Sequence, residues 1–381
     1  MSDELILTGA RIVLGDEIVE GTVRIVGETI VDIDSGRSSV LGAVDFAGDI
    51  LIPGLVDLHT DNLEKHLVPR PGVRWNALSA TLAHDAQIVS AGVTTVLDSI
   101  SVGSTMRHPE RNELLGPTLD GIRTARERAL LRSDHLLHLR CEVTDEAVVT
   151  LFEPLAGDPL LKLMSVMEHT PGKRQSPDVQ RYRLRQMKAL AYSEAEIDTH
   201  IQRLIDASAT FGPANRARLA EIGAANGIPI ASHDDETVEH VAEAVALGMT
   251  IAEFPTTDVA ARAAASSGLK VLMGAPNVIR GGSHSGNIAA GDLARAGLLS
   301  ILSSDYVPIS LLQAAFTMTA EPIGFTLPAA IRTVSAHPAE AAGLDDRGTI
   351  APGKRADMVR VRMIDDLPTV RSVWRQGRLV F

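Results

Sequence analysis

The chain has 381 residues, of which 45% are hydrophobic and 22% are charged. This composition excludes a disordered, collagen-like or low-complexity protein and indicates a globular chain. The length fits an α/β barrel with a modest accessory domain. The formal net charge of −12 argues against general nucleic-acid binding, because that function requires a basic surface.

The cysteine content and the N-terminal sequence indicate a cellular compartment. Cys141 is the single cysteine, so an intramolecular disulfide or a cysteine-based zinc ribbon is excluded. The N-terminus has acidic residues where a signal peptide would have basic ones, and the sequence has no apolar run of membrane-spanning length. We therefore expect a cytoplasmic protein that binds neither membranes nor nucleic acid.

Both ends of the chain have the short alternating pattern that is typical of β-hairpins. The N-terminal segments are LILTGARIVLG, GTVRIVGETIVDID and SVLGAVDFAG, and the C-terminal ones are MVRVRM and VRSVWRQGRLVF. We expect residues 1–52 and 345–381 to form one small composite β-sandwich domain.

Between these ends, eight apolar runs alternate with amphipathic helical stretches. The runs are GLVDLH, VTTVLDSI, LLHLRCEV, LLKLMSVMEH, IPIASHD, TIAEFPT, KVLMGAPN and LLSILSSD. This alternation predicts a parallel sheet closed as a (β/α)8 TIM-type barrel over residues 53–344. Polar residues that end several runs are His59, Asp98, Glu168, His169, His233, Glu253, Asn277 and Asp305. Catalytic groups lie at that end of barrel strands.

The connection from Thr170 to Ile228 is much longer than an ordinary βα loop and has room for two helices. It begins with PGKRQSPDVQRYRLRQMK, in which six basic residues accompany a single acidic one. Long loops on this face of a barrel often act as lids. The two alternatives for residues 171–225 are therefore a basic lid over the site and a solvated helical face.

The string LIPGLVDLHTDNLEKH has the strongest chemical pattern in the chain. It places His59 and Asp61 two positions apart, so both side chains project in the same direction from a strand. A nitrogen and an oxygen ligand suit zinc, manganese or iron better than calcium. His233 and Asp305 complete the first choice of metal ligands, and a hydrogen-bonded pair without metal is the alternative reading.

The PGLVDLHTD string, together with His233 and Asp305, resembles the amidohydrolase superfamily of metal-dependent hydrolases. The first strand of that superfamily usually ends in His-x-His, and here Asp61 replaces the second histidine. Further strings are similar to the PhnM family of phosphonate metabolism: HTDNLEKHLVPRPGVRW, HTPGKRQ, IASHDDET, AEFPTT, LMGAPNVIRGGSHSGN and LSSDYVP. The resemblance spans nearly the whole chain. It implies a diphosphatase that cleaves alpha-D-ribose 1-methylphosphonate 5-triphosphate to the 5-phosphate and pyrophosphate.

For the other metal ligands, and for the metal itself, the sequence allows more than one assignment. Glu168 or His169 is expected as a ligand that bridges two ions, with Glu168 slightly preferred. Glu253 is expected either as a ligand, as the partner of an arginine or as the cap of the next helix. Lys162 lies too early in its run to serve as a carbamylated bridging lysine. We expect one or two divalent ions, with zinc as first choice and manganese or iron as alternatives, because oxygen ligands favour the latter.

Asp305 and His233 are the expected catalytic residues. Asp305 is assigned as general base, because a carboxylate beside an ion-activated water can accept its proton. Phosphoryl transfer also requires fixed cations and hydrogen-bond donors around the phosphate chain. The expected substrate-binding residues are Lys65, His66, Arg70, Arg174, Asn277, Arg280 and His284. The last two belong to IRGGSHSGN, whose backbone N–H groups can bind a phosphate.

Two other functions were weighed against this one. A hydrolase of C–N bonds, such as a cyclic amidase or an N-deacetylase, would use the same scaffold, but the basic residues after Thr170 argue against it. A scaffold protein without metal is disfavoured by the four first-choice ligands. A homodimer is expected because proteins with this scaffold commonly form dimers. The remaining histidines are interpreted as structural: His84, His108, His135, His138, His200, His240 and His337.

Overall fold

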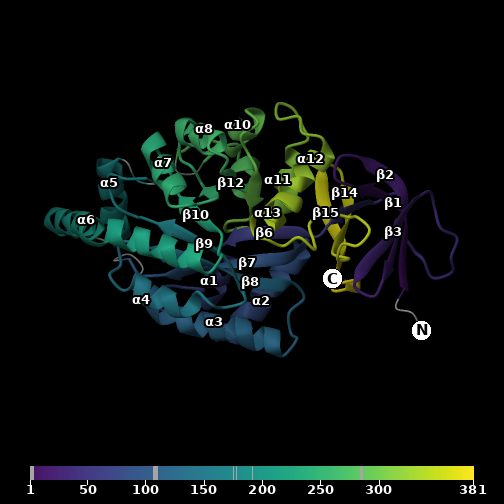
Figure 1. Cartoon of the computed structure of the whole chain (residues 1–381), viewed down its shortest axis with the longest axis horizontal. Coiled ribbons are helices and arrows are strands. Elements are labelled where there is room, and N and C mark those ends of the chain that lie inside the picture. The colour runs from purple at the N-terminus through teal and green to yellow at the C-terminus, as the bar shows by residue number, and fades with distance from the viewer. Residues whose placement is uncertain (1–3, 106–109, 175, 177, 191, 284–285) are drawn as a thin grey trace. The chain divides into compact units, whose positions relative to one another are not determined.

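The computed structural model describes residues 4–105, 110–174, 176, 178–190, 192–283 and 286–381 (Figure 1). The chain divides into two compact units. The first contains Met1–Asp98, Asp120–Leu136 and Met273–Phe381, and the second contains Ser99–Leu119 and Leu137–Leu272.

A sheet of eight strands corresponds to the eight apolar runs, in the sequential order β13-β12-β11-β10-β9-β8-β7-β6. The strands are β6 (Leu55–Thr60), β7 (Val93–Val102), β8 (Asp134–Glu142), β9 (Leu161–Met167), β10 (Ile230–His233), β11 (Ile251–Glu253), β12 (Lys270–Gly274) and β13 (Ile301–Ser303). The first and last strands meet through a parallel bridge between Thr60 and Asp305. The predicted (β/α)8 barrel is therefore confirmed. Most residues of its strands are buried because a parallel sheet is covered on both faces.

The helices follow the barrel strands. They are α1 (Asn62–Leu67), α2 (Ala77–Ser90), α3 (Arg111–Glu127), α4 (Val148–Phe152), the 3₁₀ helix η1 (Glu153–Leu155), α5 (Val179–Leu190), α6 (Glu194–Ala225), α7 (Val238–Ala246), α8 (Asp258–Ser266), α9 (Ala275–Ile279), α10 (Ala290–Arg295), α11 (Ser310–Thr317), α12 (Leu327–Arg332) and α13 (Ala336–Ala341). None of the described helices has the length and apolar character needed to cross a bilayer.

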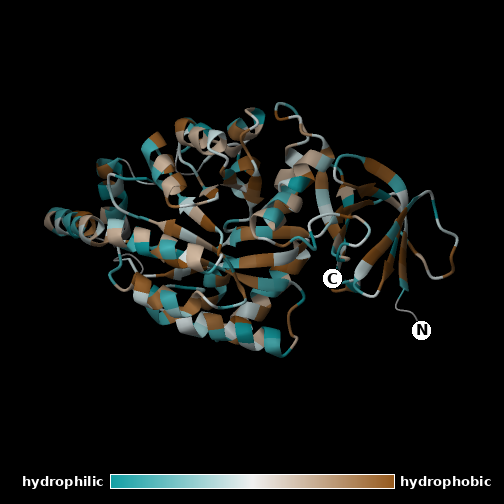
Figure 2. Ribbon diagram, in the orientation of Figure 1, coloured by the Kyte–Doolittle hydropathy of each residue, from teal (hydrophilic) through white to brown (hydrophobic). Residues whose placement is uncertain are grey.

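Helices α5 and α6 form the long insertion after β9. Helix α6 begins with a capping box, in which Ser193 and Glu196 satisfy each other's backbone N–H groups. Hydrophilic and hydrophobic residues alternate along α6, as Figure 2 shows. Tyr182 of α5 packs in a buried cluster with Ile197 and Ile201 of α6. The two helices expected in this insertion are present, and their apolar faces hold them together.

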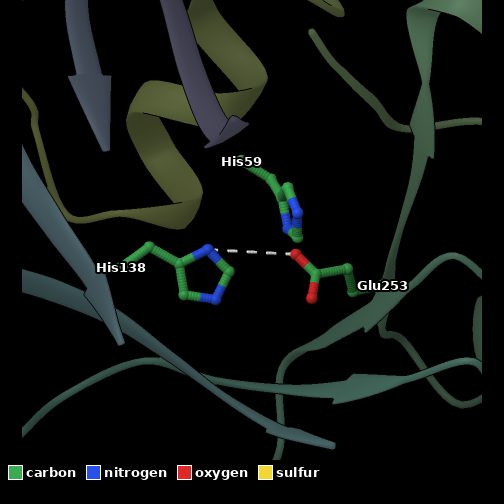
Figure 3. A group of neighbouring side chains, drawn as sticks. All are labelled: His59, His138 and Glu253. Carbon is green, nitrogen blue, oxygen red and sulfur yellow. Dashed lines mark ion pairs between the residues drawn. The ribbon is translucent and has the colours of Figure 1, made fainter. Parts of the chain in front are cut away.

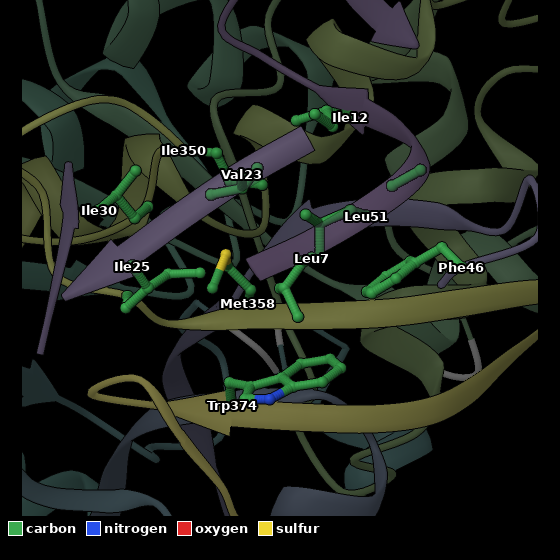
Figure 4. Close-up of a cluster of buried hydrophobic side chains, with 12 residues drawn as sticks. Leu7, Ile12, Val23, Ile25, Ile30, Phe46, Leu51, Ile350, Met358 and Trp374 are labelled. Carbon is green, nitrogen blue, oxygen red and sulfur yellow. The ribbon is translucent and has the colours of Figure 1, made fainter. Parts of the chain in front are cut away.

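The termini share a second sheet, in the order β16-β15-β14-β5-β1-β2-β3, with β4 paired to β1. Its strands are β1 (Glu4–Val13), β2 (Ile18–Val26), β3 (Thr29–Ser35), β4 (Val44–Asp45), β5 (Ile50–Pro53), β14 (Met358–Ile364), β15 (Leu367–Arg375) and β16 (Arg378–Leu379). Ile30 of β3 and Trp374 of β15 belong to one buried cluster although they lie near opposite ends of this order (Figure 4). Phe46 stacks on Trp374 with ring centroids 5.8 Å apart. The composite domain expected from both termini is thus present as one sheet that folds over its own core.

Gly54 separates the terminal sheet from the barrel, between β5 and β6. A Cβ atom at this position would lie 2.2 Å from Oγ1 of Thr94, so only glycine fits against β7 here. The run LIPGLVDLH is therefore divided between the two sheets. The proposed domain limits, residues 1–52 with 345–381 and residues 53–344, stay a prediction.

Candidate metal centre

The first group of metal-binding residues lies where β6 and β13 end. His59, Asp61 and Asp305 each offer one ligand atom, and these atoms lie within 4.8 Å of one another. Nε2 of the buried His59 is 3.6 Å from Oδ1 of Asp61. The N–H of Asp305 donates to the carbonyl of His59 (3.0 Å), and the N–H of Asp61 donates to the carbonyl of Asp305 (2.7 Å). Backbone hydrogen bonds thus hold the three residues in place before any ion binds.

The buried carboxylate of Asp57 supports this group through hydrogen bonds from the backbone. Oδ1 of Asp57 accepts hydrogen bonds from the backbone N–H groups of Ser304 (3.0 Å) and His59 (3.3 Å). Burial raises the pKa of Asp57 to about 6, although the hydrogen bonds from Ser304 and His59 oppose that shift. Asp57 therefore ties the end of β13 to β6.

The second group lies after β9 and β10 and consists of His169, His233 and Asp234, whose ligand atoms are also within 4.8 Å of one another. Nδ1 of His169 is 2.5 Å from Oε2 of Glu142, and Nδ1 of His233 is 2.6 Å from Oε2 of Glu253. Metal-binding histidines usually donate their second ring nitrogen to a carboxylate, which fixes the tautomer and the ring orientation. Both imidazoles therefore have the arrangement that metal binding through Nε2 requires.

Glu142 and His138 also contact residues of this site, although neither is among the site residues expected from the sequence. Glu142 is fully buried, and burial raises its pKa, but its interactions with His169 and Thr144 outweigh that effect and lower the pKa of Glu142. Nδ1 of His138 lies 4.0 Å from Oε1 of Glu253, the pair marked in Figure 3. Glu142 ends β8, so its strand-end position was a usable signal, whereas His138 lies inside the strand and gave none.

Glu253 lies among imidazoles and does not cap the next helix. His138 and His233 contact its carboxylate, and its pairing with an arginine stays a prediction. The N-cap of α8 is Thr257, whose side chain accepts from the N–H of Ala260. Glu253 therefore orients His233, and its expected role as a metal ligand stays a prediction.

Glu168 is held by a set of cationic and hydroxyl groups. Its carboxylate accepts from Nζ of Lys173 (2.7 Å), Oγ of Ser208 (2.6 Å) and Nη2 of Arg216 (2.6 Å). Burial raises the pKa of Glu168, but these partners outweigh burial and lower it to about 2. The structure thus places His169 in the metal-binding group and surrounds the neighbouring Glu168 with other partners.

Arg174 was expected in a basic lid, but the structure buries it with 4% of its surface exposed. Nη1 donates to Oδ1 of Asp235 (2.5 Å) and to the carbonyl of His233 (3.2 Å), while Nη2 donates to Glu243 (3.2 Å). Burial excludes the solvated-helix alternative for Arg174, and its expected contact with the substrate stays a prediction. Two carboxylates and a carbonyl use its donors, so it fixes the segment that follows His233.

The other residues expected to bind substrate lie in the first unit. Lys65 donates to the carbonyl of Tyr306, the residue after Asp305. His66 lies 3.0 Å from Oε1 of Gln87. Arg70 and Arg280 are exposed, and Arg280 follows α9 as its C-cap.

Asn277 organises the loop that leads to α10. Its side chain accepts from the N–H of Ala290 (2.9 Å) and donates to the carbonyl of Ile288 (3.4 Å). His284 lies outside the described residues, so the expected phosphate contact there stays a prediction.

A third cluster, interpreted from the sequence as separate structural histidines, is a continuous buried network. Asp98 accepts from His84 (2.8 Å) and from His135 (2.8 Å), and Nε2 of His135 is 3.4 Å from Asp85. Burial alone would lower the pKa of His135, but Asp98 and Asp85 outweigh burial and raise it to about 9. Nδ1 of His84 contacts Asn62 (3.0 Å), the first residue of α1, so the network anchors the helix after Asp61.

This network predicts a loss of stability at alkaline pH. Because the folded pKa of His135 exceeds its unfolded value of about 6.5, the charged ring stabilises the fold fully below that pH. The contribution is lost as the pH rises through about 9. We expect the thermal midpoint to fall between pH 6.5 and 9.5, with about 1–3 kcal/mol of unfolding free energy lost. The fall should be shallower in His135→Gln, and equal slopes in the two proteins would contradict the assignment.

Comparison with known proteins identifies the family. Residues 163–381 match the amidohydrolase family. The chain is also 43% identical, over 99% of its own length and 100% of the relative, to the alpha-D-ribose 1-methylphosphonate 5-triphosphate diphosphatase of Escherichia coli (strain K12). The chain belongs to the amidohydrolase family. Members of this superfamily are generally metal-dependent, and the two groups around His59 and His169 could each hold an ion in this amidohydrolase.

Solved structures share the fold at low sequence identity. N-isopropylammelide isopropylaminohydrolase from Burkholderia multivorans ATCC 17616 matches 100% of this chain and 98% of its own, with a TM-score of 0.65 and 17% identity. N-acetylglucosamine-6-phosphate deacetylase from Pasteurella multocida matches 99% of both chains, with a TM-score of 0.65 and 13% identity. These similarities support the barrel architecture of the amidohydrolase and nothing finer.

Proposed function

We propose that this amidohydrolase hydrolyses alpha-D-ribose 1-methylphosphonate 5-triphosphate to the 5-phosphate and pyrophosphate. The observation that carries the hydrolytic chemistry is the pair His169 and His233, each held at Nδ1 by a buried carboxylate. The choice of substrate is supported by the diphosphatase of Escherichia coli, which is similar along the full length of the chain.

The ligand atoms fit divalent ions. His59, Asp61 and Asp305 would hold one ion and His169, His233 and Asp234 a second, with zinc as first choice and manganese or iron as alternatives. Such an ion supplies Lewis-acid chemistry, because it polarises a phosphoryl oxygen and makes water more acidic. Preference for His169 over Glu168 rests on the partners that already surround Glu168.

Residues of the chain accept the proton of the attacking water and orient the imidazoles of His169 and His233. Asp305 accepts the proton of the attacking water, since a carboxylate beside an ion-activated water can act as a general base. Glu142 and Glu253 keep the protons of His169 and His233 on Nδ1, so each Nε2 keeps its lone pair. Asp57 holds the strand ends that position Asp305.

The remaining substrate contacts stay predictions. They concern Lys65, His66, Arg70, Arg174, Asn277, Arg280 and His284, and the cytoplasmic location and the homodimer have the same status.

Phosphorus NMR of the metal-loaded protein with the triphosphate tests the proposal. We expect a pyrophosphate signal to grow in step with the 5-phosphate. Dialysis against EDTA should lower the rate by about 100-fold or more, and added zinc, manganese or iron should restore it. Release of orthophosphate instead of pyrophosphate would contradict the proposed bond. Lack of turnover in a protein with its ion content confirmed would favour hydrolysis of a C–N bond.

A further inference from the structure

The second unit contains an open pocket of about 140 Å³ beside the histidine pair. Residues from four places in the chain line it: Thr105 after β7, the start of α3, the segment after β9, and the helices α5 and α6. His169 lies in its wall and also belongs to the second metal-binding group. A ligand in this pocket therefore borders the candidate metal centre.

The charge of the pocket is opposite to that of the chain. Arg111, Lys173 and Arg185 line it, and none of its described lining residues is an aspartate or glutamate. The whole chain has a formal net charge of −12. Lys173 is paired with Glu168, which does not line the pocket. The described contacts of Arg185 are a hydrogen bond to Ser176 (3.4 Å) and the ring face of Tyr182. Such a pocket attracts an anion.

Three side chains of the lining have buried polar atoms that make no hydrogen bond within the described residues. They are Oγ1 of Thr170, Oε1 of Gln186 and Nδ1 of His200. Thr170 and Gln186 are each 1% exposed and His200 is 3% exposed. Buried polar atoms in folded proteins nearly always have a partner, because leaving one unsatisfied is destabilising. A cluster of three around one pocket indicates that a polar ligand completes their hydrogen bonds.

These side chains can act as donors to an anion. Burial lowers the pKa of His200, so its ring is neutral, and Nε2 lies 3.4 Å from the hydroxyl of Tyr182. When that hydroxyl donates to Nε2, the ring proton is on Nδ1. The hydroxyl of Thr170 is a donor, and the amide of Gln186 presents its N–H2 group after a half-turn about its last torsion.

We propose that this pocket binds an oligophosphate chain: the outer phosphates of the triphosphate, and pyrophosphate after cleavage. Three cations and several neutral donors match the many oxygens of two linked phosphates better than the single charge of a carboxylate. The inference deepens the proposed function and rests on it for the identity of the substrate. In this proposal the insertion of residues 171–225 contributes to substrate binding through the pocket.

Isothermal titration of the metal-loaded protein with inorganic pyrophosphate tests the pocket directly. We expect Arg185→Ala to weaken binding about 10-fold or more, because a charge-assisted contact is lost. Arg181→Ala is the matched control on the same helix, since Arg181 is exposed and does not line the pocket, and it should leave affinity within about 2-fold. Equal affinities of the Arg185 variant and the unmodified protein would overturn the proposal.

Thr170→Val separates ligand binding from a structural role. Valine has the same shape as threonine and removes a hydroxyl that makes no hydrogen bond within the described residues. We expect the thermal midpoint to stay unchanged or rise, while pyrophosphate binding weakens several-fold. A lower midpoint with unchanged affinity would contradict the assignment.

The two proposals fail separately. Hydrolysis of the triphosphate with an unchanged KM in the Arg185 variant would reject the pocket and keep the proposed function. Pyrophosphate binding that depends on Arg185, without hydrolysis of the triphosphate, would keep the pocket and reject the substrate.

Discussion

Asp305→Asn should lower kcat by about 100-fold or more while the protein keeps its fold and most of its metal. Asp305 has a positive φ of 56°, a conformation that asparagine tolerates as well as aspartate does. Its N–H and carbonyl groups hold β6 through backbone hydrogen bonds that the substitution leaves unchanged. The variant therefore removes one proton acceptor and little else. Steady-state kinetics on the triphosphate, with elemental analysis of the same samples, measures the effect.

The exposed Asp366 offers the matched control, because Asp366→Asn removes the same charge in the turn between β14 and β15. That variant should retain the kcat of the unmodified protein. An Asp305→Asn enzyme with full turnover would rule out Asp305 as the general base. A variant that lost its ions together with its activity would assign Asp305 to ion binding instead.

Arg174→Met should destabilise the protein by about 3–5 kcal/mol, because the buried Asp235 would lose its cationic partner. Asp235 is 1% exposed, so water cannot replace the guanidinium. The Nη1 contact to the carbonyl of His233 would be lost as well. We expect the thermal midpoint to fall by about 5 °C or more. Differential scanning calorimetry measures this change.

Arg181→Met is the control for this prediction, since Arg181 lies in the same basic segment and is exposed. Its midpoint should shift by less than about 2 °C. As a substrate-binding residue without a structural role, Arg174 would instead give a raised KM and little change in stability when replaced. A normal midpoint and a raised KM in Arg174→Met would support that role.

The sequence by itself determined the barrel and the positions of its strand-end residues. A hydrophobic run followed by an amphipathic stretch can bury its apolar atoms only in a covered parallel strand, so each run predicts one strand. The polar residue at the end of each run then falls at the carboxyl end of a strand, where His59, His233 and Asp305 lie in the structure. The amidohydrolase resemblance depended on these same local strings.

The tertiary structure alone decided how neighbouring polar residues divide their roles. Glu168 and His169 are adjacent in the sequence and both follow β9, yet Glu168 is bound by Ser208 and Arg216 of α6, whereas His169 contacts Glu142 of β8. Arg174 resembles the other basic residues of its segment until Asp235 is brought beside it. Such partners lie tens of residues apart along the chain, and local spacing contains no information on which distant side chains will meet. Burial then decides the outcome, because a buried charge must have a partner, whereas an exposed one is already solvated by water.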